Sequence, residues 1–399
     1  MQSDRRQFLK NSLGVSAAVS AAPMIVPRRA WGANDKPAYA LIAAGGRGRY
    51  LNKVFKKLGA QCVAVCDVYE PYVEMALEDS PDARAYVDYK ELLEKEKSAD
   101  FVILAGPDHH HCPMLLASLA AGKDVYAEKP LSRTLEESQK MIQAVKQSQK
   151  VVQIGMQRRS APVIRSAKRL IDDGVLGKLA MVKPMWNWNV SGPIDNSPLP
   201  GKLDWQRFLG DAPQRELEPM RFRRWRYFWD YAGGNMTDQG THLMDVVLWF
   251  TNSGPPVSAI CNGQVNKMKG AEHPEVFCAV FEFPSFLVTW TLNYCNSYEN
   301  GWSITFMGDE GTMILDEDGY RVYQEPWALP KNREPIFYAK VAVPIEAHVQ
   351  NFLDCIKTRE QPTCDVESAA KAVAGPHLAN IAFQQGRKAT LAPDMVTVS

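Results

Sequence analysis

Short apolar runs alternate with helical patterns over the first 156 residues, and this alternation limits the fold more than any other feature. Runs typical of buried strands occur at 39–44, 61–66, 101–105, 125–127 and 151–154. Helical patterns lie between them at 50–58, 71–77, 89–95, 113–121 and 134–148. Because parallel strands need a crossover, usually a helix, this order predicts an α/β domain with a doubly wound parallel sheet.

A glycine-rich turn joins the first strand to the first helix. Ala43, Gly45 and Gly48 occupy the positions of the G-x-G-x-x-G pattern, so alanine replaces the first glycine. Gly45 would let the backbone approach a pyrophosphate, and Gly48 would allow close helix packing. The helix N-terminus would hold the phosphate charge. We therefore assign Gly45, Gly46, Arg47 and Gly48 to a dinucleotide site.

Asp67 follows the second strand, nineteen residues after Gly48. An acid at this position bonds the ribose 2′-hydroxyl of NAD and repels the 2′-phosphate of NADP. The nearby Arg47 and Arg49 could accept such a phosphate, so NADP stays open beside NAD as the predicted cofactor.

The stretch DVYAEKPL at 124–131 reads as a short strand that ends in a tight turn. Glu128 and Lys129 then leave the carboxyl end of the sheet, where doubly wound folds present groups to a ligand. The Lys129–Pro130 bond can be cis at modest cost. The stretch therefore predicts that Lys129 meets a substrate beside a bound nucleotide; the alternative is an ordinary surface turn.

A second polar constellation lies in GGNMTDQGTHLMD at 233–245. Asp238 and His242 are four residues apart, so they share one face of the predicted helix, and Asp245 shares it too. A carboxylate beside an imidazole can orient it and raise its pKa, as proton transfer to an alcohol or carbonyl requires. The alternative is a surface pair at a helix end.

PDHHH at 107–111 follows the 101–105 strand. Neighbouring histidines cannot all ligate one ion well, and no Cys or Glu completes a set, so we expect no metal. The stretch is predicted to be a loop that lines the nucleotide.

The second half of the chain has a different pattern. Strand-like runs occur at 179–188, 276–283, 286–294, 303–307 and 313–316, and helical patterns at 162–173, 234–250, 347–358 and 366–385. This order predicts an α+β domain with a mostly antiparallel sheet. A long irregular segment at 191–218 is rich in Pro, Gly and Asp, which is typical of a functional loop or an oligomer arm.

The N-terminus carries SDRRQFLK at 3–10, a twin-arginine motif, followed by a modest apolar run at 12–22. The run is too short for a stable anchor, so the motif predicts export, to the periplasm or beyond. We expect a signal or arm at 1–33, an NAD(P)-binding domain at 34–156 and a substrate and oligomerisation domain at 157–399, with final helices that can pack back on the first domain.

Composition excludes other classes. The net charge is +1 at pH 7, which gives no nucleic-acid footprint and no polybasic membrane patch. No later segment has the 18 or more apolar residues of a membrane helix. The eight cysteines are scattered and read mostly as small buried hydrophobes, although one or two disulfides stay open.

These segments together resemble the Gfo/Idh/MocA family (glucose–fructose oxidoreductase, inositol 2-dehydrogenase, rhizopine catabolism) over about residues 38–390. The resemblance rests on AAGGRG at 43–48, Asp67, PDHHH at 107–111, AGKDVYAEKPL at 121–131, GMQRRS at 155–160 and GGNMTDQGTHLMD at 233–245. HVQNFLDCIKTREQP at 348–362 and HLANIAFQQGR at 377–387 resemble exported members.

The resemblance implies a Rossmann domain and a C-terminal domain with a large open sheet, which carries the substrate pocket and often an oligomer interface, so a homodimer or homotetramer is expected. It also implies roles for single residues. Lys129 would contact nicotinamide and substrate hydroxyl, and His242 would be the acid/base beside Asp238. The cofactor positions it implies are Gly45, Gly48, Asp67, Pro107, Asp108 (for the commoner Asn), His111, Glu128, Lys129 and Arg158, the last also near substrate.

Our hypothesis is an exported NAD-dependent oxidoreductase that acts on a sugar or polyol hydroxyl. Lys129 or His242 would take the hydroxyl proton, and Asp238 would hold the imidazole. Trp186, Asn187 and Trp188 are candidates for sugar stacking and hydrogen bonding, with sheet packing as the alternative.

Free NAD should be scarce outside the cytoplasm, so a tightly bound cofactor and a redox-neutral cycle are expected. Two alternatives stay open: an NAD-dependent glycoside hydrolase that oxidises its sugar transiently, and a catalytically silent sugar-binding protein.

Overall fold

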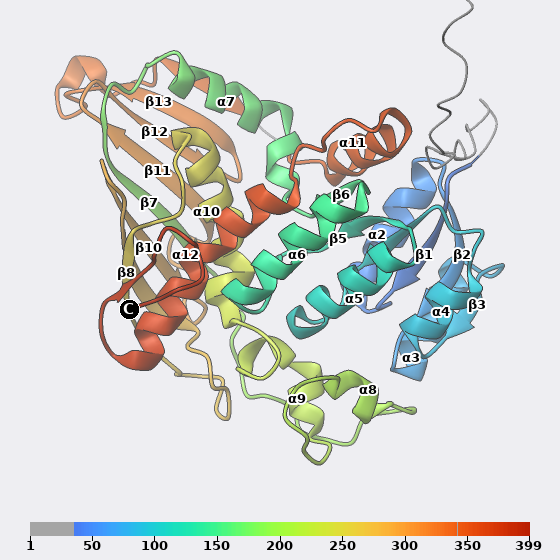
Figure 1. Ribbon diagram of the computed structural model, residues 1–399. Coiled ribbons are helices and arrows are strands. Elements are labelled where there is room, and N and C mark those ends of the chain that lie inside the picture. Colours follow the sequence, from blue (N-terminus) through green and yellow to red (C-terminus); the bar gives the residue numbers. More distant parts are fainter. Residues whose placement is uncertain (1–35, 341) are drawn as a thin grey trace, which may run out of the picture. The chain divides into compact units, whose positions relative to one another are not determined.

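The computed structural model describes residues 36–340 and 342–399, so the twin-arginine motif lies outside the described residues. Its first sheet has six parallel strands in the order β3-β2-β1-β4-β5-β6 (Figure 1). The strands are β1 (Ala38–Ile42), β2 (Gln61–Cys66), β3 (Arg84–Tyr86), β4 (Phe101–Leu104), β5 (Asp124–Ala127) and β6 (Val152–Ile154). The order reverses between β1 and β4, which confirms the predicted doubly wound sheet and locates its ligand crevice.

The helices of this half are α2 (Gly46–Lys57), α3 (Glu70–Asp79), α4 (Tyr89–Lys95), α5 (Asp108–Ala120) and α6 (Leu135–Ser148). The start of α5 corrects the sequence analysis, which made Asp108 to His111 a loop. Pro113 looked like a first-turn proline, but it lies inside the helix. Asp108 stands in the first turn of the helix instead.

The second sheet has nine strands in the order β14-β13-β12-β11-β7-β10-β9-β8-β15. Only β7 and β10 pair in parallel, so the sheet is mixed and mostly antiparallel, as predicted. Its strands are β7 (Leu179–Asn187), β8 (Ser258–Gln264), β9 (Val276–Glu282), β10 (Leu287–Asn293), β11 (Gly301–Gly308), β12 (Gly311–Asp316), β13 (Gly319–Gln324), β14 (Phe337–Lys340) and β15 (Ala389–Thr390).

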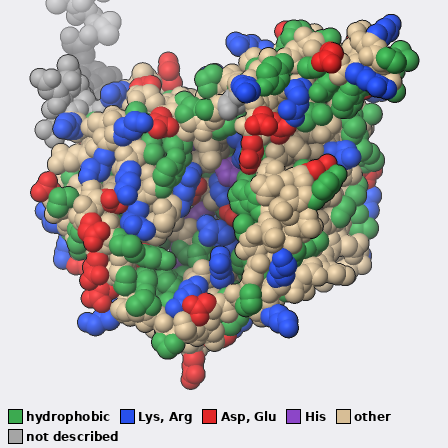
Figure 2. Space-filling model, turned by 180° about the vertical axis from the view of Figure 1, so that it is seen from behind, with side chains coloured by type: hydrophobic (Ala, Val, Ile, Leu, Met, Phe, Trp, Pro, Cys, Tyr) green, Lys and Arg blue, Asp and Glu red, His purple; other side chains and the backbone are tan. Residues whose placement is uncertain are grey.

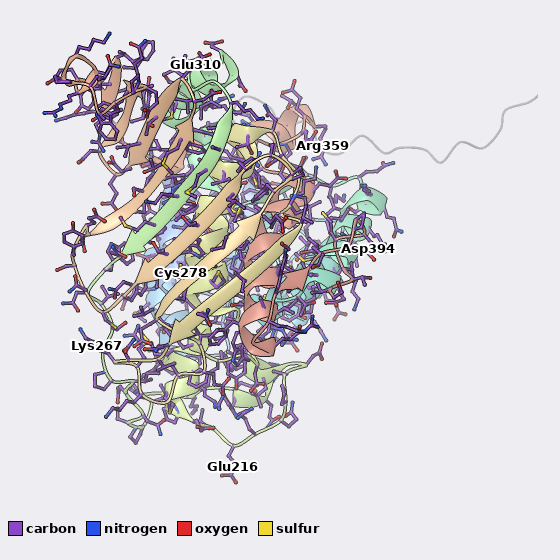
Figure 3. The ribbon with its side chains drawn as sticks, turned by 90° about the vertical axis from the view of Figure 1, so that its left-hand side faces the viewer. Glu216, Lys267, Cys278, Glu310, Arg359 and Asp394 are labelled. Carbon is purple, nitrogen blue, oxygen red and sulfur yellow. The ribbon has the colours of Figure 1, made fainter. Side chains whose placement is uncertain are left out.

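Helices cover one face of this sheet and leave the other open. α7 (Pro162–Asp172), α10 (Gly234–Thr251) and α12 (Val366–Gln385) contact its strands on the covered face, where Phe281, Trp290 and Phe306 are fully buried. Figure 3 looks onto the open face, on which Cys278 lies. This arrangement explains the alternation of buried and exposed residues along β8 and β9.

The C-terminal helices also pack on the first sheet. Val366, Ala369 and Val373 of α12 belong to the same apolar cluster as Ala40 and Val125 of the parallel strands. The ring of Phe352, in α11 (Ile345–Thr358), packs edge-on against those of Phe55, Phe101 and Tyr126. The end of the chain therefore completes the core of its beginning.

Residues 188–233, which we call the cover segment, link β7 to α10. They contain two short helices, α8 (Trp205–Leu209) and α9 (Pro219–Arg223), and the 3-10 turn η2 (Trp225–Tyr227). Two further 3-10 turns, η1 (Gln157–Ser160) and η3 (Pro330–Asn332), lie outside this segment. The segment packs on the first half of the chain through an aromatic cluster that includes Tyr69, Trp205 and Phe208. The amide of Asp204 also donates to the carbonyl of Val68 (2.8 Å). In Figure 1 the helices α8 and α9 of this segment lie below α5.

Within the described residues, no helix combines the length and apolarity needed to cross a membrane. All eight cysteines are free thiols. The same part of the chain contains no cluster of three or more His, Cys, Asp or Glu side chains arranged to hold a metal ion.

Candidate active site

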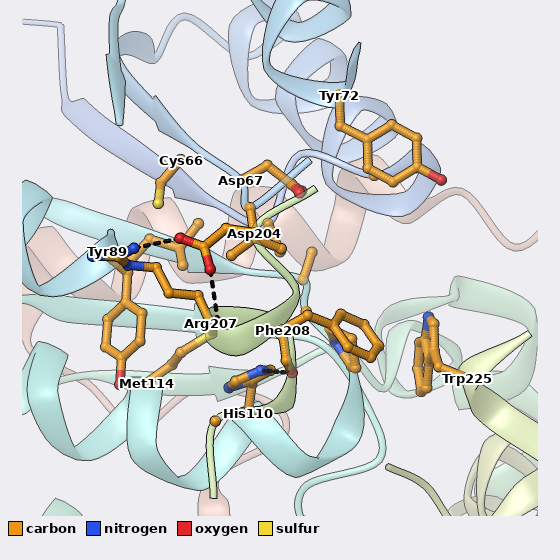
Figure 4. Close-up of a pocket in the computed structure, with 18 of the residues that line it drawn as sticks. Cys66, Asp67, Tyr72, Tyr89, His110, Met114, Asp204, Arg207, Phe208 and Trp225 are labelled. Carbon is orange, nitrogen blue, oxygen red and sulfur yellow. Dashed lines mark hydrogen bonds and ion pairs between the residues drawn. The ribbon is translucent and has the colours of Figure 1, made fainter. Parts of the chain in front are cut away.

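Two adjoining clefts lie at the carboxyl ends of the parallel strands. The larger has a volume of about 680 Å³ and is lined by the glycine turn, Asp67 and Pro107 on one side and by the cover segment on the other (Figure 4). This volume is within the range of about 300–1,000 Å³ that is usual for small-molecule sites. Figure 2 shows a face of the molecule that is hollowed near its middle, with His, Lys and Arg side chains gathered there.

The glycine turn at the larger cleft is shaped by two residues. Ala43 has φ +69°, a left-handed conformation that glycine would adopt more readily. A Cβ on Gly48 would lie 2.1 Å from the carbonyl oxygen of Ala43, so only glycine lets α2 approach the turn this closely. A Cβ on Gly46 would meet nothing within 4 Å, so the start of α2 is open to a ligand.

Asp67 lies at the end of β2 and lines the larger cleft. One carboxylate oxygen accepts a hydrogen bond from the amide of Ala44 (2.7 Å) and the other from the amide of Tyr69 (2.9 Å). Burial raises the pKa of Asp67 to about 6, although these amides oppose the rise. A carboxylate has about four acceptor positions, so Asp67 can still accept bonds from two hydroxyl groups.

The smaller cleft has a volume of about 220 Å³ and contains Lys129, Asp238 and His242. It shares Arg47, Ala105, Gly106, Trp225 and Arg226 with the larger cleft. The two clefts therefore meet, and the three polar residues that the sequence singled out from two distant segments face the same space.

Lys129 and Asp238 form an ion pair in the smaller cleft. The Lys129 ammonium donates to Oδ1 of Asp238 and to its backbone carbonyl, the latter at 3.1 Å, and the Lys129–Pro130 bond is cis. Arg226 Nε lies 3.5 Å from the same Oδ1. Burial would raise the pKa of Asp238, but Lys129 and Arg226 outweigh it and lower that pKa to about 2. The carboxylate is therefore fully ionised at neutral pH.

His242 departs from the sequence analysis, which placed Asp238 against the imidazole and expected a raised pKa. Asp238 is engaged by Lys129 instead, and Nδ1 of His242 is buried without a hydrogen-bond partner among the described residues. Burial, followed by the charges of Arg158 and Lys129, holds the pKa of His242 well below its ordinary value. The imidazole is therefore neutral at physiological pH.

Glu128 and Arg47 form a second ion pair at the junction of the clefts. Nη2 of Arg47, in the first turn of α2, lies 2.7 Å from Oε1 of Glu128. Glu128 is buried, and a Cβ on Gly155 would come within 2.8 Å of its Oε1. This pair ties the glycine turn to the strand end that carries Lys129.

His111 and Asp108 are buried and do not line either cleft. Nδ1 of His111 lies 2.6 Å from the carbonyl oxygen of Pro130, and its Nε2 lies 2.9 Å from that of Gly106. His111 thus holds the turn after Lys129 against the end of β4. Burial raises the pKa of Asp108 to about 8, so its carboxyl group is largely neutral at pH 7. Of this motif, Pro107 and the unassigned His110 line the larger cleft.

Arg158, Trp186 and Trp188, which the sequence assigned to cofactor or substrate, do not line either cleft. Arg158 packs instead against Trp186 of β7 and Trp302 of β11. The buried guanidinium lies 4.3 Å from the Trp302 ring centroid and 5.3 Å from that of Trp186, and burial lowers the pKa of Arg158 to about 10. Trp186 belongs to the core, and Trp188 stacks on Tyr294 with centroids 5.6 Å apart.

Asn187 is placed differently from the sequence expectation. Side chains alternate along a strand, so it points away from Trp186, and its amide donates to the carbonyl of Tyr298 (3.0 Å). The structure does not bring Asn187 to the cleft.

The irregular segment at 191–218 was expected to be a functional loop or an oligomer arm, and its residues Asp204, Arg207 and Phe208 do line the larger cleft. The sequence did not single out Trp225 and Arg226, which line both clefts, or Gln157 of η1, which lines the smaller one. The basic and aromatic run RFRRWRYFWD at 221–230 was a signal for the first two, but it carries no defined spacing. Asp245, which shares a helix face with His242, is instead paired with Arg159 (Nε to Oδ1, 2.8 Å).

Two family descriptions match this chain. "Oxidoreductase family, NAD-binding Rossmann fold" covers residues 38–156, and "Oxidoreductase family, C-terminal alpha/beta domain" covers residues 168–391.

Curated relatives match mainly over shorter stretches. Inositol 2-dehydrogenase of Salmonella typhimurium is 35% identical over 126 residues, which is 31% of this chain and 37% of that protein. Levoglucosan dehydrogenase of Pseudarthrobacter phenanthrenivorans is 28% identical over 162 residues, 40% of this chain and 35% of the relative. The chain thus spans little more than a third of the length of these relatives.

Solved structures match over most of the chain. The WlbA dehydrogenase from Bordetella pertussis, in complex with NADH and UDP-GlcNAcA, has a TM-score of 0.68 and 19% identity, and the match covers 90% of this chain and 99% of that one. A levoglucosan dehydrogenase complex with NADH and levoglucosan has a TM-score of 0.69 and 17% identity, covering 89% and 99%. At these identities the likeness shows the fold alone.

Proposed function

The chain belongs to the Gfo/Idh/MocA oxidoreductase family and carries its NAD-binding Rossmann domain, and from that premise we propose that it oxidises a hydroxyl group of a sugar or polyol with NAD. The observation that carries the proposal is the convergence of Lys129, Asp238 and His242 on a small cleft that opens into the larger one. We call the larger the nucleotide cleft and the smaller the substrate cleft.

The residues of the nucleotide cleft fit NAD. The open start of α2 at Gly46 suits the phosphates, and the free acceptor positions of Asp67 suit ribose hydroxyls. The carboxylate of Asp67 disfavours the extra phosphate of NADP. When bound, NAD⁺ supplies the acceptor for the hydride that leaves the carbinol carbon as the alcohol becomes a carbonyl.

The ion pair of Lys129 and the burial of His242 support different roles for the two residues. Lys129, held by Asp238, would donate a hydrogen bond to the substrate hydroxyl oxygen and stabilise negative charge on it. His242 is neutral and lines the same cleft, so it would accept the hydroxyl proton. Of the two bases considered from sequence, the lowered pKa of His242 and the ion pair of Lys129 therefore support His242.

The test is made on the protein as purified. Denaturation should release NAD or NADH, about one per chain, identified by absorbance and mass. Addition of inositol, levoglucosan or a hexose to the intact protein should then reduce bound nicotinamide. A protein that neither contains nor binds a nicotinamide nucleotide would exclude an oxidoreductase and leave the sugar-binding alternative.

Export and cofactor retention form the finer part of the proposal. The twin-arginine motif supports export of a folded chain, and the cover segment, which lines the nucleotide cleft, supports a cofactor that is not exchanged. A retained cofactor must be regenerated in place, either by reducing a second sugar or by a sequence of oxidation, elimination and re-reduction. The second route would make the protein an NAD-dependent glycoside hydrolase.

Deuterium at the sugar carbons distinguishes these routes. Turnover that cleaves a C–H bond of the sugar without net formation of NADH supports a redox-neutral cycle. If the same turnover also releases a glycosidic group, it supports the glycoside hydrolase. Accumulation of one equivalent of NADH per product excludes both cycles. Fusion of residues 1–33 to a reporter that works only outside the cytoplasm tests export.

A further inference from the structure

The substrate cleft carries an excess of positive charge. Among the described residues that line it, Arg47 is paired with Glu128, and Lys129 is paired with Asp238. Arg226 is a further cation, and its Nε lies 3.5 Å from the Asp238 oxygen that Lys129 already occupies. The Asp238 carboxylate is therefore shared by Lys129 and Arg226, so the side chains that line the cleft carry one more positive charge than negative charge.

Groups behind the cleft do not cancel this excess. Asp108 is largely neutral at pH 7, because burial raises its pKa to about 8. Tyr227 and Tyr294 also face Asp238, and burial raises the pKa of both phenols. The neighbouring charges that lower the pKa of His242 are those of Arg158, Lys129, Arg47 and His348. The side chains that line the cleft therefore carry a net positive charge.

The guanidinium of Arg226 is positioned so that it can bind an anion in the cleft. Its guanidinium lies 4.1 Å from the ring centroid of Trp225, and stacking on an indole leaves the N–H groups at the edge of the fork free to bind an anion. The side chain is 42% exposed, so it can exchange water for a ligand at modest cost. A neutral sugar would leave this donor set only partly used.

We propose that the substrate is an acidic sugar whose carboxylate or phosphate group binds Arg226. The inference rests on the proposed function, since it names the substrate class of the same cleft. Arg226 is then a specificity-determining residue, because a guanidinium forms strong paired hydrogen bonds with either anion.

Binding to the nucleotide-containing protein tests the substrate class. Dissociation constants for glucuronate, glucose 6-phosphate and glucose are measured by calorimetry and by the fluorescence of the tryptophans. At least one acid should bind about tenfold more tightly than glucose. Preference for glucuronate identifies a carboxylate and preference for glucose 6-phosphate a phosphate. Equal or weaker binding of both acids overturns the proposal.

Three variants test whether Arg226 binds the acidic group of the substrate. Arg226→Gln should abolish the preference for the acid, and Arg226→Lys should retain most of it. Arg224→Ala, an exposed arginine two residues away, is the matched control and should keep it in full. An intact preference in Arg226→Gln refutes the assignment. Weaker NAD binding in that variant with an unchanged acid preference would mean that Arg226 serves the nucleotide, and refutes it equally.

Reduction of bound nicotinamide is followed separately, so the two proposals fail in different ways. A protein that prefers the acid but never reduces its nucleotide refutes the oxidoreductase and leaves the charge argument intact. Reduction by a neutral sugar with no acid preference refutes the acidic substrate alone.

Discussion

Lys129 is the residue on which the chemistry of the substrate cleft depends most. Its ammonium is fixed by Asp238 beside neutral His242. Lys129→Ala removes the donor to the substrate oxygen and should lower the rate of hydride transfer about 10²–10⁴-fold. Stopped-flow reduction of bound NAD measures this rate. Nucleotide content should stay at the wild-type level, and Lys140→Ala, at an exposed position on α6, should leave both unchanged.

His242 sets the acid limit of the reaction. Its neutral form accepts the proton, and its pKa is held well below the ordinary value of about 6.5 by burial and neighbouring cations. The rate of sugar oxidation should therefore stay flat as the pH falls from 8 to 6.5 and decline only at lower pH. A pH profile of single-turnover rates checks this. A midpoint at or above 6.5 would mean that another group is the base.

The cover segment is the element that encloses the nucleotide. Arg207 of α8 is paired with Asp204 and lies 3.4 Å from Asp88, which precedes α4 on the other wall of the cleft. Arg207→Ala removes this contact across the cleft and should speed NAD dissociation severalfold, since weakly held segments open more often.

Release of NAD into an excess of a competing nucleotide measures this dissociation. Glu216→Ala is the control, because Glu216 is an exposed residue of the same segment whose side chain projects away from the molecule (Figure 3). NAD should dissociate from this variant at the wild-type rate. An unchanged rate in Arg207→Ala would show that the contact does not limit release.

Local pattern predicted most elements of the fold, because each strand and helix buries one periodic face. α12 has the predicted bounds of residues 366 and 385, and strand bounds differ by one or two residues. Errors arose where tertiary contacts decide. Asp238 and His242 share a face of α10, yet Asp238 bonds to Lys129, which lies in the turn after β5. The role of Arg226 depends on how a segment without periodicity folds, and no local pattern encodes that.

At the scale of the whole molecule, buried histidines should make the protein sensitive to acid. Burial lowers the pKa of His273 to about 3 and of His348 and His377 to about 4, and those of His109 and His242 fall well below the ordinary value. In the unfolded chain each histidine becomes protonated as the pH falls through about 6.5, whereas in the folded protein it stays neutral to a lower pH. Their contribution to stability is therefore full above pH 6.5 and is lost as the pH falls.

The buried carboxyl groups act in the opposite sense. Burial raises the pKa of four carboxyl groups, those of Asp67, Asp108, Glu137 and Asp245, so acid favours the folded state through them. The pKa is also lowered for His110 and His111, so seven histidines act against these four carboxyl groups. The melting temperature should fall steadily from pH 7 to pH 5. Calorimetry in buffers of equal ionic strength measures it, and a melting temperature that rises over this range contradicts the expectation.

Assembly is a second property of the whole molecule, and we propose a homodimer or homotetramer. The open face of the nine-stranded sheet exposes apolar side chains, among them Ile260 and Leu287. Such a patch on a sheet marks an association surface. Light scattering gives the number of copies, and a monomeric wild-type protein would refute the proposal.

The placement of α12 has a consequence for the timing of synthesis. Val366, Ala369 and Val373 complete the apolar core around β1 and β5, so the first 156 residues cannot finish folding while the last 35 are still on the ribosome. Nascent chains of the N-terminal half should thus be open to proteases and unable to take up a nucleotide. We therefore expect a nucleotide to bind only after the α12 residues have been synthesised and have packed on the parallel sheet.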